Sequence, residues 1–349
     1  MKLGLNLGYW GGGNDADNLA LAVEADTLGY DVAWVAEAYG SDAPTVLAWV
    51  GAQTTRIDIG SAIFQIPGRT PANCAMTAAT LDTLSGGRFR LGLGVSGPQV
   101  SEGWHGVRFD KPLARTREYS DIVKLALSRE KVRYDGQHYV LPLPDGPGKA
   151  LQLTVHPVRE HIPMYLAAVG PKNLELAGEL FDGWLAIFYS PDYAKESLAS
   201  IAAGRAKVGK TLEGFDVVPT MPLVVGDDPK ACADMVRWYA ALYVGGMGSR
   251  DKNFYNQLAV RMGFEAAAAE IQDKYLARDY DRAAQAVPHE FIDATALLGT
   301  KDRIAEKMQV LAASGVTTLT VSPFGASQHE KIASLRTAVE ALEQSGVSG

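Results

Sequence analysis

The chain has 349 residues, of which 47% are hydrophobic and 21% are charged, enough for one large globular domain or two of medium size. Its 33 lysines and arginines against 40 aspartates and glutamates leave a formal net charge of −7, which argues against nucleic acid or an anionic membrane as the main partner. Cys74 and Cys232 are too few for a disulfide framework or a thiolate metal site. Because there is no secretion signal and no run of about 18 apolar residues, we expect a cytoplasmic protein.

Strand-like runs rich in Val, Ile and Leu alternate with helix-periodic segments along most of the chain. The first four runs begin 30, 25 and 31 residues apart, which is the spacing of strand-plus-helix units. Eight such units predict an α/β fold of the (β/α)8 TIM-barrel type, with a doubly wound parallel sheet as the alternative. The expected strands begin near Lys2, Val32, Ile57, Arg88, Met164, Trp184, Val217 and Thr317.

Several predicted helices have recognisable ends. Asn14 or Asp15 can cap the first helix, and Gly29 can end it. The helix that begins at Pro71 follows a threonine cap and stops at a glycine pair, and another begins near Pro171. These signals support helices between the expected strands.

A (β/α)8 barrel needs about 250 residues, so a single domain over 1–349 has residues left for insertions. We place them at about 97–111, 131–162 and 243–290, that is, after the fourth strand, before the fifth and after the seventh. The second contains Asp135-Gly136, a signal for a two-residue hairpin turn. Because long loops often carry function, we expect the first and third insertions to cover the active face.

Gly92, Gly94 and Gly97 spell the G-x-G-x-x-G pattern of dinucleotide-binding folds. Three expected strands precede them and a loop-like stretch starting at Pro98 follows, so the context does not fit that fold. We interpret them as a strand end where a flat or phosphorylated ligand approaches the backbone, with plain strand packing as the alternative. The stretch "GRAKVGKT" from Gly204 matches a phosphate loop literally but follows a predicted helix, so we interpret it as a helix end.

The sequence offers no metal-binding or serine-hydrolase motif. The six histidines form no H-E-x-x-H, and Pro157 keeps His156 and His161 from sharing a regular helix. No G-x-S-x-G nucleophile elbow is present. We therefore expect no metal held by the protein.

Glu37 is the strongest candidate for acid-base chemistry. It follows an apolar strand in "YDVAWVAEAYG", and catalytic groups of barrel enzymes project from the ends of strands. A carboxylate walled by Trp34 and Tyr39 would have a raised pKa and could donate or accept a proton. The alternative is a structural carboxylate that hydrogen-bonds near a helix N-terminus.

Four stretches together resemble the bacterial-luciferase-like superfamily. They are "WVAEAYGSDA" (34–43), "IGSAIFQIPGRTPANCAMTAATLDTLSGGRFRLGLGVSGPQV" (59–100), "EGWHG" (102–106) and "AAVGPKNLELAGELFDGW" (167–184). The resemblance extends in order over nearly the whole chain. It is greatest to the branch that uses the deazaflavin coenzyme F420, which includes methylenetetrahydromethanopterin reductase and a glucose-6-phosphate dehydrogenase.

The resemblance implies a deazaflavin pocket at the carboxyl ends of the barrel strands. A non-prolyl cis peptide at about Ala62-Ile63 would back the ring, and the backbone of Val95, Ser96 and Gly97 would border the ring or its tail. The amides of Ala168, Val169 and Gly170 would face the coenzyme phosphate, which agrees with the preference of helix N-termini for anions. Glu37 falls where relatives carry an acidic residue beside the ring. Ala38 stands where the sugar-phosphate dehydrogenase has a histidine, which implies a different substrate.

These observations predict an F420-dependent oxidoreductase that passes a hydride between the deazaflavin and a small organic substrate, with a proton from Glu37. Tyr9, Trp10 and Trp104 would line the substrate side, although rim or core positions suit them equally. An FMN-dependent luciferase-like monooxygenase and a coenzyme-binding protein without catalysis are the alternatives. We expect a homodimer because relatives commonly pair.

Overall fold

The computed structural model describes residues 1–11 and 15–349. The helix after the first strand, α1, covers Asp15–Leu28, and Gly29 follows it with a left-handed φ of +81°. Glycine is suited to that conformation, which supports its predicted role as the helix stop. Asn14, the other predicted cap, lies outside the described residues.

Eight parallel strands close into a barrel. Each strand pairs with the next around the ring, and the last, β12, pairs with both β10 and β1. The (β/α)8 prediction is confirmed, the doubly wound alternative is wrong, and each strand begins within one residue of the expected position. The barrel strands are β1 (Lys2–Asn6), β2 (Val32–Val35), β3 (Asp58–Ser61), β5 (Phe89–Gly94), β8 (Met164–Ala167), β9 (Gly183–Ile187), β10 (Asp216–Val225) and β12 (Thr318–Pro323).

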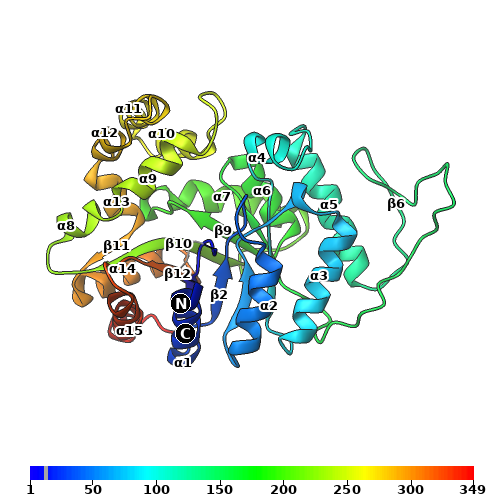
Figure 1. The fold of residues 1–349 in the computed structure, drawn as a ribbon, viewed down its shortest axis with the longest axis horizontal. Coiled ribbons are helices and arrows are strands. Elements are labelled where there is room, and N and C mark those ends of the chain that lie inside the picture. The colour runs from blue at the N-terminus through cyan, green and yellow to red at the C-terminus, as the bar shows by residue number, and fades with distance from the viewer. Residues whose placement is uncertain (12–14) are drawn as a thin grey trace.

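Helices surround the barrel and bury their apolar faces against it (Figure 1). Many begin with a proline in the first turn after a capping residue, because proline has no amide hydrogen to leave unpaired there. The outer helices after α1 are α2 (Ala43–Gln53), α3 (Pro71–Leu84), α5 (Pro112–Leu127), α6 (Pro171–Leu180), α7 (Pro191–Lys207), α14 (Lys301–Ala313) and α15 (Gln328–Ser345).

Two outer helices, α6 and α7, pack unusually close through glycines. A Cβ on Gly204 would lie 1.8 Å from the carbonyl oxygen of Glu175, and one on Gly178 would lie 2.0 Å from that of Ile201. Gly204 therefore lies within α7 and serves helix packing. The interpretation of "GRAKVGKT" as a helix end is confirmed.

A bulge interrupts the third strand at the carboxyl end of the barrel. The peptide bond between Ala62 and Ile63 is cis, at the position that the resemblance implied. The chain then continues as β4 (Phe64–Gln65) and a short helical turn, η1 (Ile66–Gly68). Here β4 pairs with the end of β5, so the bulge lies directly against that strand.

Gly92 and Gly94 in β5 make room for this bulge. A Cβ on Gly92 would lie 1.9 Å from the carbonyl oxygen of Ser61, and one on Gly94 would lie 2.8 Å from the Ile63 side chain. The Ser61 hydroxyl donates to the Gly92 carbonyl at 2.8 Å and accepts from its amide at 2.9 Å. Close strand packing thus explains these two glycines, and the approach of a ligand to this strand end stays a prediction.

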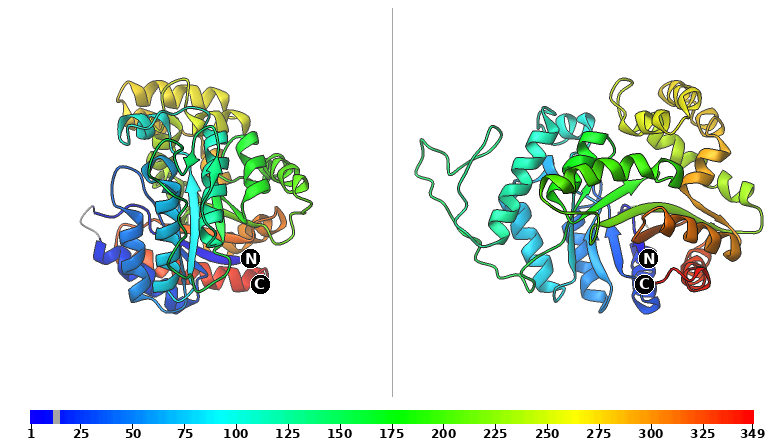
Figure 2. Two further views of the ribbon diagram at one scale, coloured as in Figure 1. Left: turned by 90° about the vertical axis from the view of Figure 1, so that its right-hand side faces the viewer. Right: turned by 180° about the vertical axis from the view of Figure 1, so that it is seen from behind.

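Three segments depart from the repeating unit. The first contains α4 (Pro98–Gly103), and the second carries the small antiparallel pair β6 (Tyr134–Asp135) and β7 (Val140–Leu141), which extends to the side of the barrel (Figure 2). The third joins β10 to the short strand β11 (Leu297–Gly299). Its helices are α8 (Pro229–Asp234), α9 (Arg237–Ala241), the π-helix η2 (Leu242–Gly246), α10 (Phe254–Arg261), α11 (Glu265–Leu276), α12 (Tyr280–Gln285) and α13 (His289–Thr295).

The hairpin of the second segment has a longer loop than its Asp-Gly signal predicted. Four residues, 136–139, separate β6 from β7. The buried Glu118 carboxylate accepts hydrogen bonds from the amides of Gln137, His138 and Tyr139 at 2.9, 2.8 and 3.1 Å. The loop is therefore shaped by a partner from α5, which local turn chemistry could not show.

The amino ends of the strands are closed by charged groups. The guanidinium of Arg90, buried inside the barrel, donates to Asp31 at 2.6 Å and to Asp58 at 2.7 Å. At the same end the amino group of Met1 donates to the carbonyl of Val347 at 2.6 Å, so the two termini lie together (Figure 1). Within residues 1–11 and 15–349, no helix is long and apolar enough to span a bilayer.

Candidate active site at the mouth of the barrel

The carboxyl ends of the strands open at the face covered by α4 and by the helices of the third segment (Figure 1). Barrel enzymes place their active sites at this end. The two covering segments touch: the rings of Phe109 and Phe254 have centroids 6.3 Å apart. The first and third segments therefore meet over the strand ends.

The floor of the mouth is apolar. Trp34 and Tyr165 pack edge to face inside the barrel, with ring centroids 5.3 Å apart. Partly buried Ala62, Ile63 and Ala167 lie against this interior cluster. Small apolar side chains at the cis bulge form a surface on which a flat ring could lie.

The loop after β5 presents unused backbone donors. The amides of Val95, Ser96 and Gly97 donate to no other group in the described part of the chain. Ser96 adopts a left-handed φ of +58°, and its hydroxyl accepts from the Gln65 side chain at 2.7 Å. The side-chain oxygen Oε1 of Gln65 also contacts Nε2 of His105 at 3.0 Å, which ties the first segment to the bulge.

A second set of donors follows β8. Across residues 1–11 and 15–349, no acceptor pairs with the amides of Ala168, Val169 and Gly170. Gly170 precedes α6 with no side-chain cap, and a Cβ there would meet open space. The carbonyl of Ala168 accepts from the Trp184 indole at 2.9 Å, which fixes the loop. The three amides and the helix N-terminus make a site suited to an anion.

A guanidinium lies beside this loop. Arg261, at the end of α10, donates to the carbonyl of Val169 and to the Tyr193 hydroxyl, both at 3.1 Å. The neighbouring pocket is lined by Ala168, Val169, Trp184, Ile187, Phe188, Tyr189, Ser190, Tyr193, Ala194, Ser197 and Leu258. Sequence reasoning missed Arg261, because only packing of the third segment brings it to the loop.

Glu37 is held by an extensive set of donors. Its two carboxylate oxygens accept from both ends of the Arg69 guanidinium at 2.7 and 2.8 Å. The amide of Gln65 donates at 3.1 Å and that of Ala43, the first residue of α2, at 3.3 Å. Arg69 itself lies over the Phe64 ring, 4.5 Å from the centroid. Burial opposes the charge of Arg69, but its hydrogen bond to Glu37 and the charge of that carboxylate outweigh burial and raise the pKa of the guanidinium.

This arrangement corrects the surroundings expected for Glu37. Trp34 points into the barrel cluster, and Tyr39 is 65% exposed, so the two do not wall the carboxylate. Glu37 joins β2, the bulge and the start of α2 instead. Geometry favours the structural alternative, because donors already occupy both oxygens.

The three aromatic residues expected on the substrate side occupy different environments. Tyr9 is 47% exposed in the loop after β1 and is flanked by tyrosines of the third segment. Trp10 is only 6% exposed and packs edge to face on Trp49 of α2, at 5.5 Å between centroids, so it is a core residue. Trp104 ends α4 and is 66% exposed. Of the three, Tyr9 alone lies beside other aromatic groups of the mouth.

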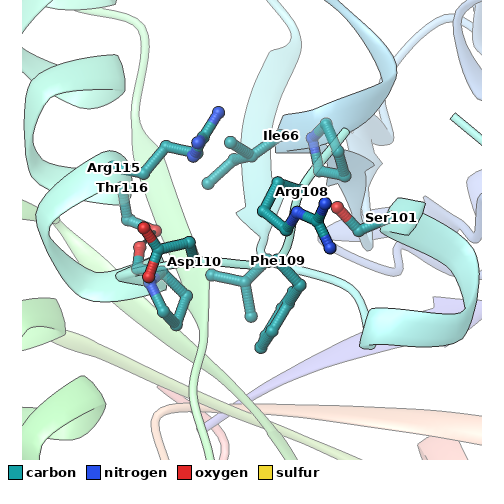
Figure 3. A pocket seen from close by; sticks show the side chains of 10 residues that line it. Ile66, Ser101, Arg108, Phe109, Asp110, Arg115 and Thr116 are labelled. Carbon is teal, nitrogen blue, oxygen red and sulfur yellow. Dashed lines mark hydrogen bonds between the residues drawn. The ribbon is translucent and has the colours of Figure 1, made fainter. Parts of the chain in front are cut away.

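A second cavity lies between the first segment and α5. Figure 3 shows Arg115 and Asp110 on one side of it and Arg108 and Ser101 on the other, with Ile66 above and Phe109 below. It reaches Val95, which directly follows β5. In the described parts of the chain, no three His, Cys, Asp or Glu side chains gather as metal ligands.

Comparison with known proteins places this geometry in a family. Residues 9–318 match the model of the luciferase-like monooxygenases. The protein belongs to this luciferase-like family. The superfamily resemblance of the four sequence stretches is therefore confirmed.

Relatives of this luciferase-like protein cover almost its full length. A protein of Mycobacterium tuberculosis, named provisionally as a coenzyme F420-dependent oxidoreductase, is 45% identical over 342 residues, or 96% of this chain and 99% of the relative. The 5,10-methylenetetrahydromethanopterin reductase of Archaeoglobus fulgidus is 29% identical, over 88% and 90%. The structure of the F420-dependent tetrahydromethanopterin reductase of Methanopyrus kandleri superposes with a TM-score of 0.82 at 24% identity, over 98% of both chains, which supports the fold.

Proposed function

We propose that the protein is a coenzyme F420-dependent oxidoreductase that transfers a hydride between the deazaflavin and a small organic substrate. The observation that carries the proposal is the apolar floor at the cis bulge, bordered by two loops whose backbone amides have no partner among the described residues. The name of the 45% identical relative supports the same coenzyme.

The residues present fit a flat coenzyme with an anionic tail. Ala62 and Ile63 would back the ring, and the amides of Val95, Ser96 and Gly97 would border it. Ala168, Val169 and Gly170 would hold a phosphate, since open space above Gly170 leaves room for it. When bound in its reduced form, the deazaflavin supplies a hydride, and the protein orients the reactants and excludes water.

A titration of the purified protein tests the coenzyme. F420 and FMN are added separately while absorbance and fluorescence are followed. Saturable binding of F420 with no binding of FMN is the expected result, whereas the reverse supports the FMN-dependent monooxygenase. Binding of F420 without turnover of any carbonyl, imine or sugar phosphate favours the coenzyme-binding alternative.

We further propose a homodimer in the cytoplasm. Trp49 on α2 and Met76 and Leu84 on the neighbouring α3 are exposed large apolar side chains, which suit a protein interface. Cys74 and Cys232 are unpaired thiols, as in a reducing compartment. Light scattering coupled to gel filtration tests the dimer, and a monomer mass at micromolar concentration contradicts it.

A further inference from the structure

Four tyrosines gather beside the mouth, and sequence reasoning found only Tyr9 among them. Tyr239 comes from α9, Tyr243 from η2 and Tyr255 from α10. The ring of Tyr243 lies 4.8 Å from that of Tyr239 and 5.0 Å from that of Tyr255, measured between centroids. We call Tyr9, Tyr239, Tyr243 and Tyr255 the tyrosine cluster.

The tyrosine cluster is joined to the candidate coenzyme loop through Phe188. This residue directly follows β9 and holds a left-handed φ of +50°. Its ring lies 5.8 Å from that of Tyr243, and the residue also lines the cavity that contains Ala168 and Val169. The cluster therefore continues the wall of the proposed coenzyme site.

The rings of the tyrosine cluster pack on one another and on Phe188 and Phe324. Burial is the largest cause of the raised pKa of Tyr9, Tyr239, Tyr243 and Tyr255, and the main further influences come from other tyrosines. Burial and the neighbouring Tyr9 raise the pKa of Tyr255 to about 12. The hydroxyls therefore remain protonated donors at neutral pH. A charged ligand would be desolvated here without a counter-charge, which is costly.

We propose that the tyrosine cluster lines the substrate site and that this site takes an uncharged carbonyl compound. The hydroxyls of Tyr9 and Tyr243 donate hydrogen bonds to the carbonyl oxygen of that compound. This inference rests on the proposed function and adds the substrate class. A sugar phosphate, the substrate named for some F420-dependent relatives, does not suit an uncharged wall.

The placement of the two hydroxyls suits proton delivery. Reduced F420, when bound, would supply a hydride to the carbonyl carbon, and the C=O π pair would move onto the oxygen. That oxygen takes a proton from a phenol, and water restores the phenol proton. Tyr9 is 47% exposed and lies near the partly buried Tyr243, so it can connect the substrate site to solvent. Glu37 is not required, because Arg69 holds its carboxylate.

Binding to the F420-loaded protein tests the substrate class without turnover. Cyclohexanone and benzaldehyde serve as uncharged probes and glucose 6-phosphate as the charged one, each followed by ligand-observed NMR. We expect the uncharged probes to bind and the sugar phosphate not to bind. Y243F removes one hydroxyl and keeps the ring, so its affinity for the uncharged probes should fall about tenfold. Binding of glucose 6-phosphate, or no binding of either uncharged probe by the unmodified protein, overturns the proposal.

Kinetics with reduced F420 test the hydrogen-bonding role. Y9F and Y243F should each lower kcat/KM for the bound carbonyl by about 100-fold. Tyr280, on α12 outside the cluster, is exposed, so Y280F is the matched control and should keep the unmodified rate. Each variant is first titrated with F420. If F420 does not bind the unmodified protein, the proposed function fails; if F420 binds and both phenylalanine variants keep the full rate, the inference alone fails.

Discussion

Arg69 meets both carboxylate oxygens of Glu37 in a buried, parallel pair, with side chains only 10% and 8% exposed. The pair joins the bulge after β3 to the loop after β2, and these two segments border the floor of the mouth. Removing one partner of such a pair leaves the other buried without compensation, which is far more costly than losing a surface ion pair.

We therefore expect E37Q to destabilise the protein by about 3 kcal/mol. Glutamine keeps the volume of the side chain but leaves the Arg69 charge unpaired. The free energy of unfolding from urea denaturation checks this, and the double variant E37Q/R69M should recover much of the loss. If E37Q unfolds at the same urea concentration as the unmodified protein but no longer turns over substrate, the proton-donor hypothesis for Glu37 is supported instead.

Gly92 should tolerate no side chain. G92A would place a Cβ 1.9 Å from the carbonyl oxygen of Ser61, a backbone atom that cannot move aside without displacing the bulge. We expect a loss of more than about 3 kcal/mol in the free energy of unfolding, or no folded protein. G103A is the control, because a Cβ there meets no atom within 4 Å, and it should unfold like the unmodified chain. Equal stability of both variants would contradict the packing explanation.

Substitutions of Gly170 test the proposed anion site before α6. An aspartate at this helix cap has room and would accept from the free amides, so G170D should fold. Its negative charge would repel the coenzyme phosphate, and we expect the Kd for F420 to rise about tenfold. G170N separates charge from size and should bind more tightly than G170D. Unchanged binding in a fluorescence titration of G170D would rule out a phosphate at this loop.

Glu118 should make the free energy of unfolding depend on pH in the acidic range. Burial alone would raise the pKa of Glu118, but hydrogen bonds from the amides of His138, Gln137 and Tyr139 outweigh it and hold the pKa below its ordinary value of 4.5. Because the folded pKa is the lower one, the stabilisation is complete above that ordinary value and is lost as the pH falls toward the folded pKa. E118Q should therefore be less stable than the unmodified protein at pH 7, and the gap should narrow below about pH 4.5. A constant gap from pH 7 to pH 3 would contradict this.

The barrel itself was predictable from the sequence, because buried parallel strands are short runs of Val, Ile and Leu and helix ends carry local signals. The start of β8 at Met164 illustrates this, since it falls at the predicted residue. The cis peptide at Ala62-Ile63 was found through family resemblance, as nothing in the residue types around it marks such a bond.

The partners within the site were beyond sequence reasoning. Arg69 lies 32 residues after Glu37 and reaches it only because β2 and β3 are neighbours in the barrel. Tyr239, Tyr243 and Tyr255 lie in the helices of the third segment, whose approach to the mouth depends on tertiary packing. The spacing of the strands therefore located the mouth, while the tyrosines of its wall were found only in the structure.

The hydrogen bond from the amino group of Met1 to the carbonyl of Val347 has a practical consequence. Both ends of the chain emerge at the amino face of the barrel, across the molecule from the mouth (Figure 1). An affinity tag, a fluorescent fusion partner or a surface linker attached to either end would leave the entrance facing solution. A short peptide bridge between the ends would also permit circular permutation, with new ends in an exposed loop such as the hairpin between β6 and β7.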